Sequence, residues 1–153
     1  MPARIESAVA GDLESIRVLL HGVSLPTEGL REHLTTALIA REGDAVVGCV
    51  ALEVYGEAAL LRSLAVMPSR QSGGLGRRLV SAALDLGRER GVTTFSLLTT
   101  TAPDFFARHF GFTAVARDAV PPAVRQSVEF ESACPATAQA MILVQPRCPI
   151  LPL

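Results

Sequence analysis

The stretch at residues 60–91 of this 153-residue chain reads LLRSLAVMPSRQSGGLGRRLVSAALDLGRERG. Residues 60–66 form a short apolar run that is typical of a buried strand, and Pro68 ends it because proline cannot donate to a sheet ladder. From Leu75 onward the apolar residues recur at helical spacing, and Gly91 closes the predicted helix. The stretch therefore predicts a strand, a glycine-rich loop and a helix, in that order.

The loop between this strand and this helix predicts a site for an anion. Residues 70–77 read RQSGGLGR, and glycine lets the backbone approach a ligand and turn its N–H groups outward. These groups lie at a helix N-terminus, which favours phosphate, and Arg70 and Arg77 add positive charge on either side. We expect the loop to bind a phosphorylated ligand. The alternative is a glycine-rich turn that only caps the helix.

Composition and length predict one domain over residues 1–144 and a loosely ordered, proline-rich tail at 145–153. A formal net charge of −1 gives no general attraction to nucleic acid or to an anionic membrane. No apolar run is long enough to span a bilayer and the N-terminus lacks a signal-peptide pattern, so we expect a cytoplasmic protein. The cysteines, Cys49, Cys134 and Cys148, are too scattered for a disulfide framework or a metal site.

The rest of the chain predicts an α+β fold with strands of mixed direction. Strands are expected at 4–8, 39–42, 45–54, 93–100, 112–116 and 140–144. Helices are expected at 12–22 and 102–110, and a turn at 25–28 is expected to lead into a short helix that runs to about residue 38. A further short helix is expected within 120–127, and an irregular segment at 130–135. The strand–helix–strand order from residue 60 to residue 100 predicts a parallel pair joined by a right-handed crossover.

These features resemble the GCN5-related N-acetyltransferase (GNAT) superfamily. Gln71, Gly74 and Gly76 fit its Q/R-x-x-G-x-G/A signature, after a strand that ends in LAV-x-P and before a downstream Gly-Phe pair at 111–112. The resemblance covers approximately residues 4–144 and implies a mixed, mainly antiparallel twisted sheet with a splayed parallel strand pair, flanked by helices. A Walker A loop is excluded because Arg77 follows Gly76, and a Rossmann fingerprint is excluded because Leu79 replaces its third glycine.

The resemblance implies acetyl-CoA as the co-substrate and no metal. It places the pantetheine arm against the backbone of Leu64, Ala65 and Val66, with an oxyanion donor at a backbone N–H near Leu64 or Ala65. It assigns the pyrophosphate to Gln71, Ser72, Gly73, Gly74, Leu75, Gly76 and Arg77. Thr99 and Thr100 stand where the family carries an Asn that contacts the cofactor. The alternative is that these threonines are only good strand formers.

Longer segments are similar to the small acetyltransferases encoded in arsenic-resistance operons. They read LPTEGL, LEVYGEAALLRSLAV, LLTTTA, VPPAVRQSVEF and CPATA. That group is associated with acetylating glutamate-like amino acids, including arsenical and phosphinic analogues, so the resemblance implies a small-molecule amine as the acceptor. A catalytically weak CoA-binding sensor or regulatory protein, and a protein N-acetyltransferase, are the alternatives. The sequence leaves open whether the chain forms a homodimer.

The usual acid of the family is replaced in this chain. Many members carry a tyrosine four residues before the Gly-Phe pair, and Ala107 has that position here. Glu53 and Tyr55 are two residues apart at a strand end and so point to the same face. We predict that Glu53 is the general base, directly or through water, and that Tyr55 is the acid or a substrate ligand. The alternative is a solvated edge pair.

Arg62 is the predicted acceptor-binding residue. A charged residue inside an apolar strand is costly to bury without a partner, and its forked guanidinium suits a carboxylate. The alternative is an edge-facing arginine or one that is paired with Glu53. Arg125 and Glu129, late in the chain, are further candidates for the acceptor pocket.

Overall fold

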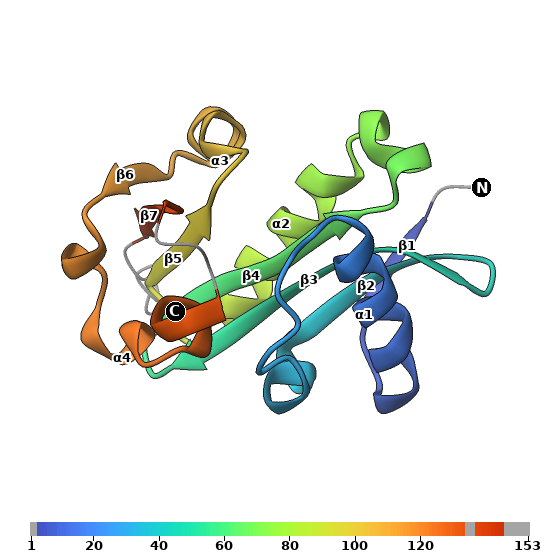
Figure 1. Ribbon diagram of the computed structural model, residues 1–153, viewed down its shortest axis with the longest axis horizontal. Helices are drawn as coiled ribbons and strands as arrows, with labels where there is room; N and C mark the ends of the chain where they lie inside the picture. The colour runs from blue at the N-terminus through green and yellow to red at the C-terminus, as the bar shows by residue number, and fades with distance from the viewer. Residues whose placement is uncertain (1–2, 134–136, 146–153) are drawn as a thin grey trace, which may run out of the picture.

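The computed structural model describes residues 3–133 and 137–145. These residues form a seven-stranded sheet with the order β1-β2-β3-β4-β5-β7-β6 (Figure 1). Its strands are β1 Arg4–Ser7, β2 Ala37–Glu42, β3 Ala45–Tyr55, β4 Ala58–Val66, β5 Thr94–Thr99, β6 Thr113–Val115 and β7 Gln139–Val144. Of the neighbouring pairs, β4 and β5 run parallel and the others run antiparallel. The predicted mixed, mainly antiparallel sheet is confirmed.

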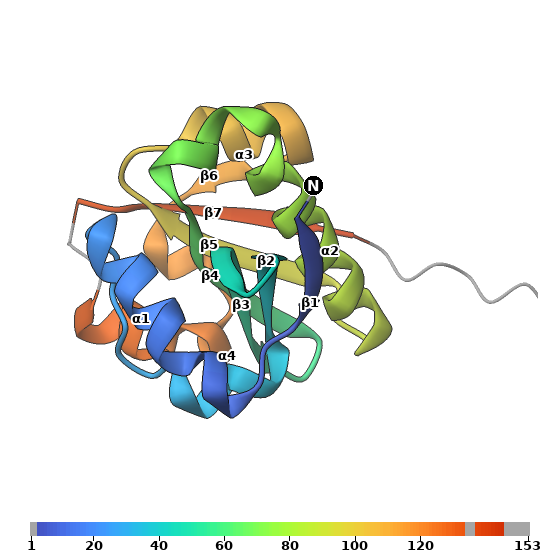
Figure 2. The same cartoon turned by 90° about the vertical axis from the view of Figure 1, so that its right-hand side faces the viewer.

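Helices cover both faces of the sheet (Figure 2). One face carries α2 Leu75–Glu89 and α3 Pro103–Phe110, and the other carries α1 Leu13–Gly22 and α4 Pro122–Arg125. Leu75, Leu79 and Ala83 of α2 are buried in the core, which accounts for the helical spacing of the apolar residues there. Shorter turns are η1 Ala10–Asp12, η2 Arg31–Thr36, η3 Pro68–Gly73, η4 Arg117–Ala119 and η5 Glu129–Ala133.

Some segments differ from the sequence prediction. The short helix expected between the turn at 25–28 and about residue 38 is a 3₁₀ helix, η2, that ends earlier, at Thr36, and strand β2 begins at Ala37. The buried run that begins there pairs with β1 and β3, and this pairing overrides its helical pattern. In the segment expected to be irregular, Glu129–Ala133 form a π-helical turn. Residues 134–135 of that segment, and the predicted tail after residue 145, lie outside the described residues.

β4 and β5 pair over only three residues each. Residues 58–60 of β4 lie opposite residues 94–96 of β5, and beyond them the two strands separate. β4 also contains a bulge, because Ala51 pairs with Arg62 whereas Cys49 pairs with Ala65. Ser63, inside the bulge, has a φ of 61°, in the left-handed region that serine rarely adopts. The second half of β4 therefore has no ladder to β5, and the predicted splayed pair is confirmed.

Substitution of Gly87 in α2 can test how closely this helix packs on the sheet. A Cβ at this position would lie 2.4 Å from Cε1 and 2.6 Å from Cζ of Phe95. We therefore expect Gly87→Ala to lower the free energy of unfolding by about 1–3 kcal/mol in urea denaturation. Gly22→Ala, at the end of α1, is the control: no atom lies within 4 Å of its Cβ, so its stability should stay equal or rise. A stabilised Gly87→Ala variant would contradict this packing.

Candidate active site

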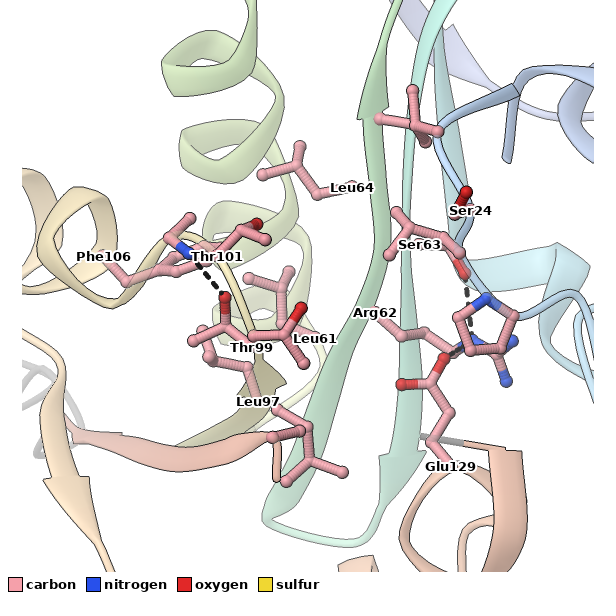
Figure 3. A pocket seen from close by; sticks show the side chains of 18 of the residues that line it. Ser24, Leu61, Arg62, Ser63, Leu64, Leu97, Thr99, Thr101, Phe106 and Glu129 are labelled. Atoms are coloured by element: carbon pink, nitrogen blue, oxygen red, sulfur yellow. Dashed lines mark hydrogen bonds and ion pairs between the residues drawn. The ribbon is translucent and has the colours of Figure 1, made fainter. Parts of the chain in front are cut away.

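A cavity of about 290 Å³ lies where β4 and β5 separate (Figure 3). Residues 61–66 of β4 and residues 97–102 at the end of β5 line two of its sides, and the loop at 23–26, after α1, lines a third. A strand edge without a ladder partner offers backbone N–H and C=O groups to an extended ligand. The cavity is therefore the candidate active site. β4 is its central wall.

The residues predicted to bind the cofactor fall into two groups. The cavity is lined by Leu64, Ala65, Val66, Gln71, Thr99 and Thr100. The others, Ser72, Gly73, Gly74, Leu75, Gly76 and Arg77, form the loop before α2 and its first turn. Arg78 N–H donates to the Gly74 carbonyl over 3.2 Å, so the N–H groups of residues 75–77 precede the helical ladder. Such an N-terminus is an anion site.

Several polar side chains near the loop bind the protein itself. Gln71 Nε2 donates to the Val66 carbonyl over 3.0 Å, and Thr99 Oγ1 accepts from the Ala102 N–H over 3.0 Å. Arg70 donates to both carboxylate oxygens of Glu42, over 2.7 and 2.9 Å, so its charge is paired with a carboxylate of the protein. These contacts shape the loop and the end of β5, and they engage the polar ends of these three side chains within the protein.

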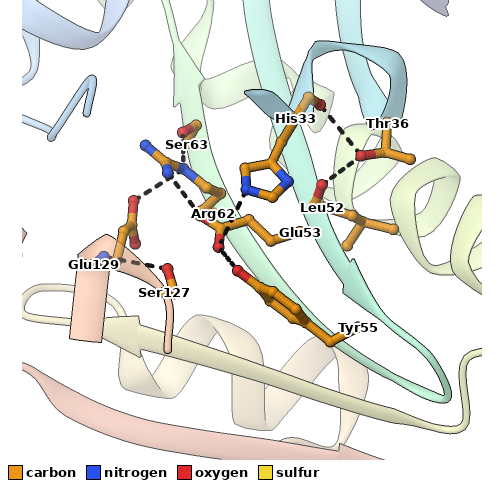
Figure 4. A network of polar contacts seen from close by, with 9 residues as sticks. All are labelled: His33, Thr36, Leu52, Glu53, Tyr55, Arg62, Ser63, Ser127 and Glu129. Carbon is orange, nitrogen blue, oxygen red and sulfur yellow. Dashed lines mark hydrogen bonds and ion pairs between the residues drawn. The ribbon is translucent and has the colours of Figure 1, made fainter. Parts of the chain in front are cut away.

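A buried ionic network centres on Arg62 (Figure 4). Arg62 Nη1 lies 2.7 Å from Glu53 Oε2, and Arg62 Nε lies 3.1 Å from Glu129 Oε2 and 3.0 Å from Ser63 Oγ. Arg62 is 3% exposed and Glu53 is 1% exposed. The ion pair with Glu53, the alternative considered for Arg62, is therefore present. Nη2 of Arg62 is buried without a hydrogen-bond partner among the described residues.

Glu53 and Tyr55, both on β3, continue this network beyond the Arg62 guanidinium. The Tyr55 hydroxyl donates to Glu53 Oε1, and His33 Nε2 lies 3.6 Å from the same oxygen. Burial alone would raise the pKa of Glu53, but hydrogen bonds from Tyr55, Arg62 and Ser127 hold it below its ordinary value. Burial, and then the nearby Glu53 carboxylate, raises the pKa of Tyr55. At neutral pH the pair is thus a carboxylate and a neutral phenol.

The network changes what can be expected of Glu53 and Tyr55. Glu53 is not a solvated edge residue, and the described residues that line the cavity include neither of the two. Their roles as base and acid stay predictions. The sequence did not link His33 and Ser127 to Glu53: His33 lies in η2 and Ser127 between α4 and η5, and neither follows a spacing that connects it to β3. Glu129, only a candidate before, lines the cavity and contacts Arg62.

Two other kinds of site are not found in the described residues. No group of three or more His, Cys, Asp or Glu side chains among them is placed to hold a metal ion. Within the same residues, no helix combines the length and the apolar character needed to cross a bilayer.

The sequence matches the Acetyltransferase (GNAT) family over residues 13–112, and the chain belongs to this family. Over 122 residues it is 31% identical to an amino-acid acetyltransferase of Neisseria meningitidis serogroup A, covering 78% of this chain and 27% of that protein. The chain thus spans only about a quarter of the length of the curated relatives it matches.

Solved structures show the same fold. N-acetylglutamate synthase from Neisseria gonorrhoeae, complexed with coenzyme A and N-acetyl-glutamate, superposes with a TM-score of 0.80 at 25% identity, over 95% of this chain and 35% of that chain. Rv2747 from Mycobacterium tuberculosis, in complex with CoA and a second ligand, gives a TM-score of 0.78 at 25% identity, over 94% and 99% of the two chains. The predicted GNAT-like fold is confirmed.

The charge of Glu53 can be tested through stability. Glu53→Gln should lower the free energy of unfolding by about 3 kcal/mol at neutral pH, because Arg62 loses a buried charged partner. The pKa of Glu53 is lowered in the folded chain, so its contribution is present above the unfolded pKa of about 4.3 and is lost as the pH falls through the folded value. The difference between wild type and variant should therefore shrink below about pH 4 in urea titrations.

Glu42→Gln is the matched control for this experiment. Glu42 also binds an arginine through both oxygens, but Arg70 is exposed, so the loss should stay under about 1 kcal/mol. Equal effects of the two substitutions would show that the buried pair does not stabilise the chain.

Proposed function

We propose that the chain is an acetyl-CoA-dependent N-acetyltransferase that acts on the amine of a small, glutamate-like amino acid, with arsenical and phosphinic analogues in the same class. The observation that carries the proposal is the buried guanidinium of Arg62, whose Nη2 lacks a partner among the described residues, in the wall of the cavity between β4 and β5. An amino-acid acetyltransferase and an N-acetylglutamate synthase among the relatives support it.

The residues on the β5 side of β4 fit acetyl-CoA, and two of the solved relatives are described in complex with CoA. The separated edge of β4 at Leu64, Ala65 and Val66 can pair with an extended arm that carries amides. The N–H groups at the start of α2 favour a pyrophosphate. When bound, acetyl-CoA supplies the acetyl group as a thioester. The bulge at Ser63 turns the backbone of β4, and we assign the oxyanion donor to the N–H of Leu64 or Ala65.

The residues on the other side of β4 orient the acceptor. Arg62 Nη2 donates to a carboxylate of the acceptor and so directs its amine toward the separated strands. Figure 4 shows that Arg62 Nη1 donates to Glu53, which also accepts from Tyr55, and we assign to these contacts the role of holding the guanidinium in this direction. They also remain our candidates for base and acid. Since neither of them lines the cavity, a proton would reach them through water.

A CoA-binding sensor is the second candidate, and Ala107 is the observation that favours it. The usual acid is absent from that position of α3. Release of free thiol from acetyl-CoA, measured with a panel of glutamate, its phosphinic and arsenical analogues, other amino acids and polyamines, separates the two functions. An acetyltransferase gives turnover that depends on the amine. Tight acetyl-CoA binding with no turnover for any amine would favour the sensor.

The loop before α2 gives a test of the cofactor side. Gly74 has a φ of 80°, which costs an L-residue about 1–2 kcal/mol, so Gly74→Ala should shift the backbone at the helix start. We expect the Kd of acetyl-CoA to rise about tenfold, measured by calorimetry. Gly111→Ala is the control, because Gly111, directly after α3, has the same φ of 80° and no atom within 4 Å of its Cβ but lies outside the loop and does not line the cavity. Equal Kd values for the two variants would argue against this loop as the pyrophosphate site.

Arg62 gives the corresponding test of the acceptor side. Arg62→Lys keeps the charge but loses the fork, so kcat/KM for glutamate should fall by about 100-fold while the Kd of acetyl-CoA stays within about twofold. Arg41→Lys is the control, because Arg41 also binds two carboxylates, Glu6 and Asp12, but does not line the cavity. It should leave both constants unchanged. Equal loss of acceptor and acetyl-CoA binding in Arg62→Lys would remove Arg62 as the acceptor anchor.

A further inference from the structure

Glu129 contributes a carboxylate to the same cavity wall as Arg62. It is 4% exposed, it begins the η5 turn, and its Oε2 lies 3.1 Å from Arg62 Nε. Figure 3 shows Glu129 and Arg62 pointing toward each other on the side of β4 where Ser24 also lies, with Leu64 and Thr99 on the other side. The acceptor side of the cavity therefore presents a cation and an anion in direct contact.

We infer that the Arg62–Glu129 pair recognises the α-amino-acid head group, and that Glu129 binds the acceptor's ammonium before acetyl transfer. The inference rests on the proposed function and adds that the site binds the acceptor by its α-amino and α-carboxylate groups. The α-amino and α-carboxylate groups of an amino acid share one carbon, so the groups that bind them must be neighbours. Arg62 and Glu129 meet this condition. A carboxylate has two acceptor oxygens, so it can contact Arg62 and an ammonium together.

The surrounding residues hold Glu129 in this place. The N–H of Glu129 donates to Ser127 Oγ over 3.2 Å, and Ser127 is itself buried. On the opposite side, a Cβ on Gly29 would lie 3.0 Å from Val128 Cγ1 and 3.3 Å from Arg62 Nη1. The loop after α1 thus packs closely, at Gly29, against both Arg62 and the segment before η5. A pair held in this way can select a ligand by the spacing of its charges.

The test compares three compounds on wild type, Glu129→Gln and Glu129→Asp, with thermal unfolding as the check that each variant is folded. L-glutamate carries the complete head group, 4-aminobutyrate has its amine and carboxylate far apart, and glutarate lacks the amine. In wild type, glutamate should be acetylated with a kcat/KM about 10- to 100-fold above that of 4-aminobutyrate. Glutarate should act as a competitive inhibitor against glutamate.

Glu129→Gln should lower kcat/KM for glutamate by about 10- to 100-fold, with a smaller loss in Glu129→Asp. Its Ki for glutarate should stay equal or decrease, because a negative charge next to the bound anion is removed. A general structural defect would weaken both compounds together, and that result would overturn the inference, as would unchanged glutamate kinetics in both variants. Wild type that releases thiol with no amine at all would instead overturn the proposed function.

Discussion

The buried pairing of Arg62 with Glu53 and Glu129 is the interaction on which the proposed acceptor side of the cavity depends. A guanidinium that leaves water costs several kcal/mol unless charged partners surround it. Glu53 binds Nη1 and Glu129 binds Nε, so Nη2 is the guanidinium nitrogen for which the described residues provide no acceptor. The contacts that make a charge tolerable inside β4 therefore also give its remaining donor a fixed direction. Pre-organisation of this kind lowers the cost of binding a carboxylate.

β4 connects this network to the cofactor side. Its backbone separates from β5 after residue 60, and its side chains at Arg62 and Ser63 belong to the ionic network. A single strand therefore positions the groups assigned to both substrates, which is how a transferase brings two reactants together. Cys49 supports the bulge, because its thiol donates to the Ser63 carbonyl over 3.2 Å. Burial raises the pKa of that thiol to about 12, so it keeps its proton.

The strand, loop and helix of residues 60–91 could be predicted because the spacing of apolar residues and the proline and glycine residues that end each element are local signals. Arg62 could be singled out because it is the one charged residue in the apolar run of β4. The two-residue spacing of Glu53 and Tyr55 likewise placed them on one face. The bulge could not be predicted, since Ser63 adopts a positive φ without being glycine. His33 and Ser127 could not be linked to Glu53 from the sequence, for another reason. Tertiary packing of η2 and of the α4–η5 segment brings them to Glu53, and no local pattern records such contacts.

A crystal structure of the chain with CoA and L-glutamate measures the central contact directly. We expect a carboxylate oxygen of glutamate within about 3 Å of Arg62 Nη2, in the cavity between β4 and β5. The ion pair of Arg62 with Glu53 should remain in place in that complex. If glutamate instead binds with its carboxylate on other residues while Arg62 contacts only Glu53 and Glu129, Arg62 is not the residue that binds the acceptor.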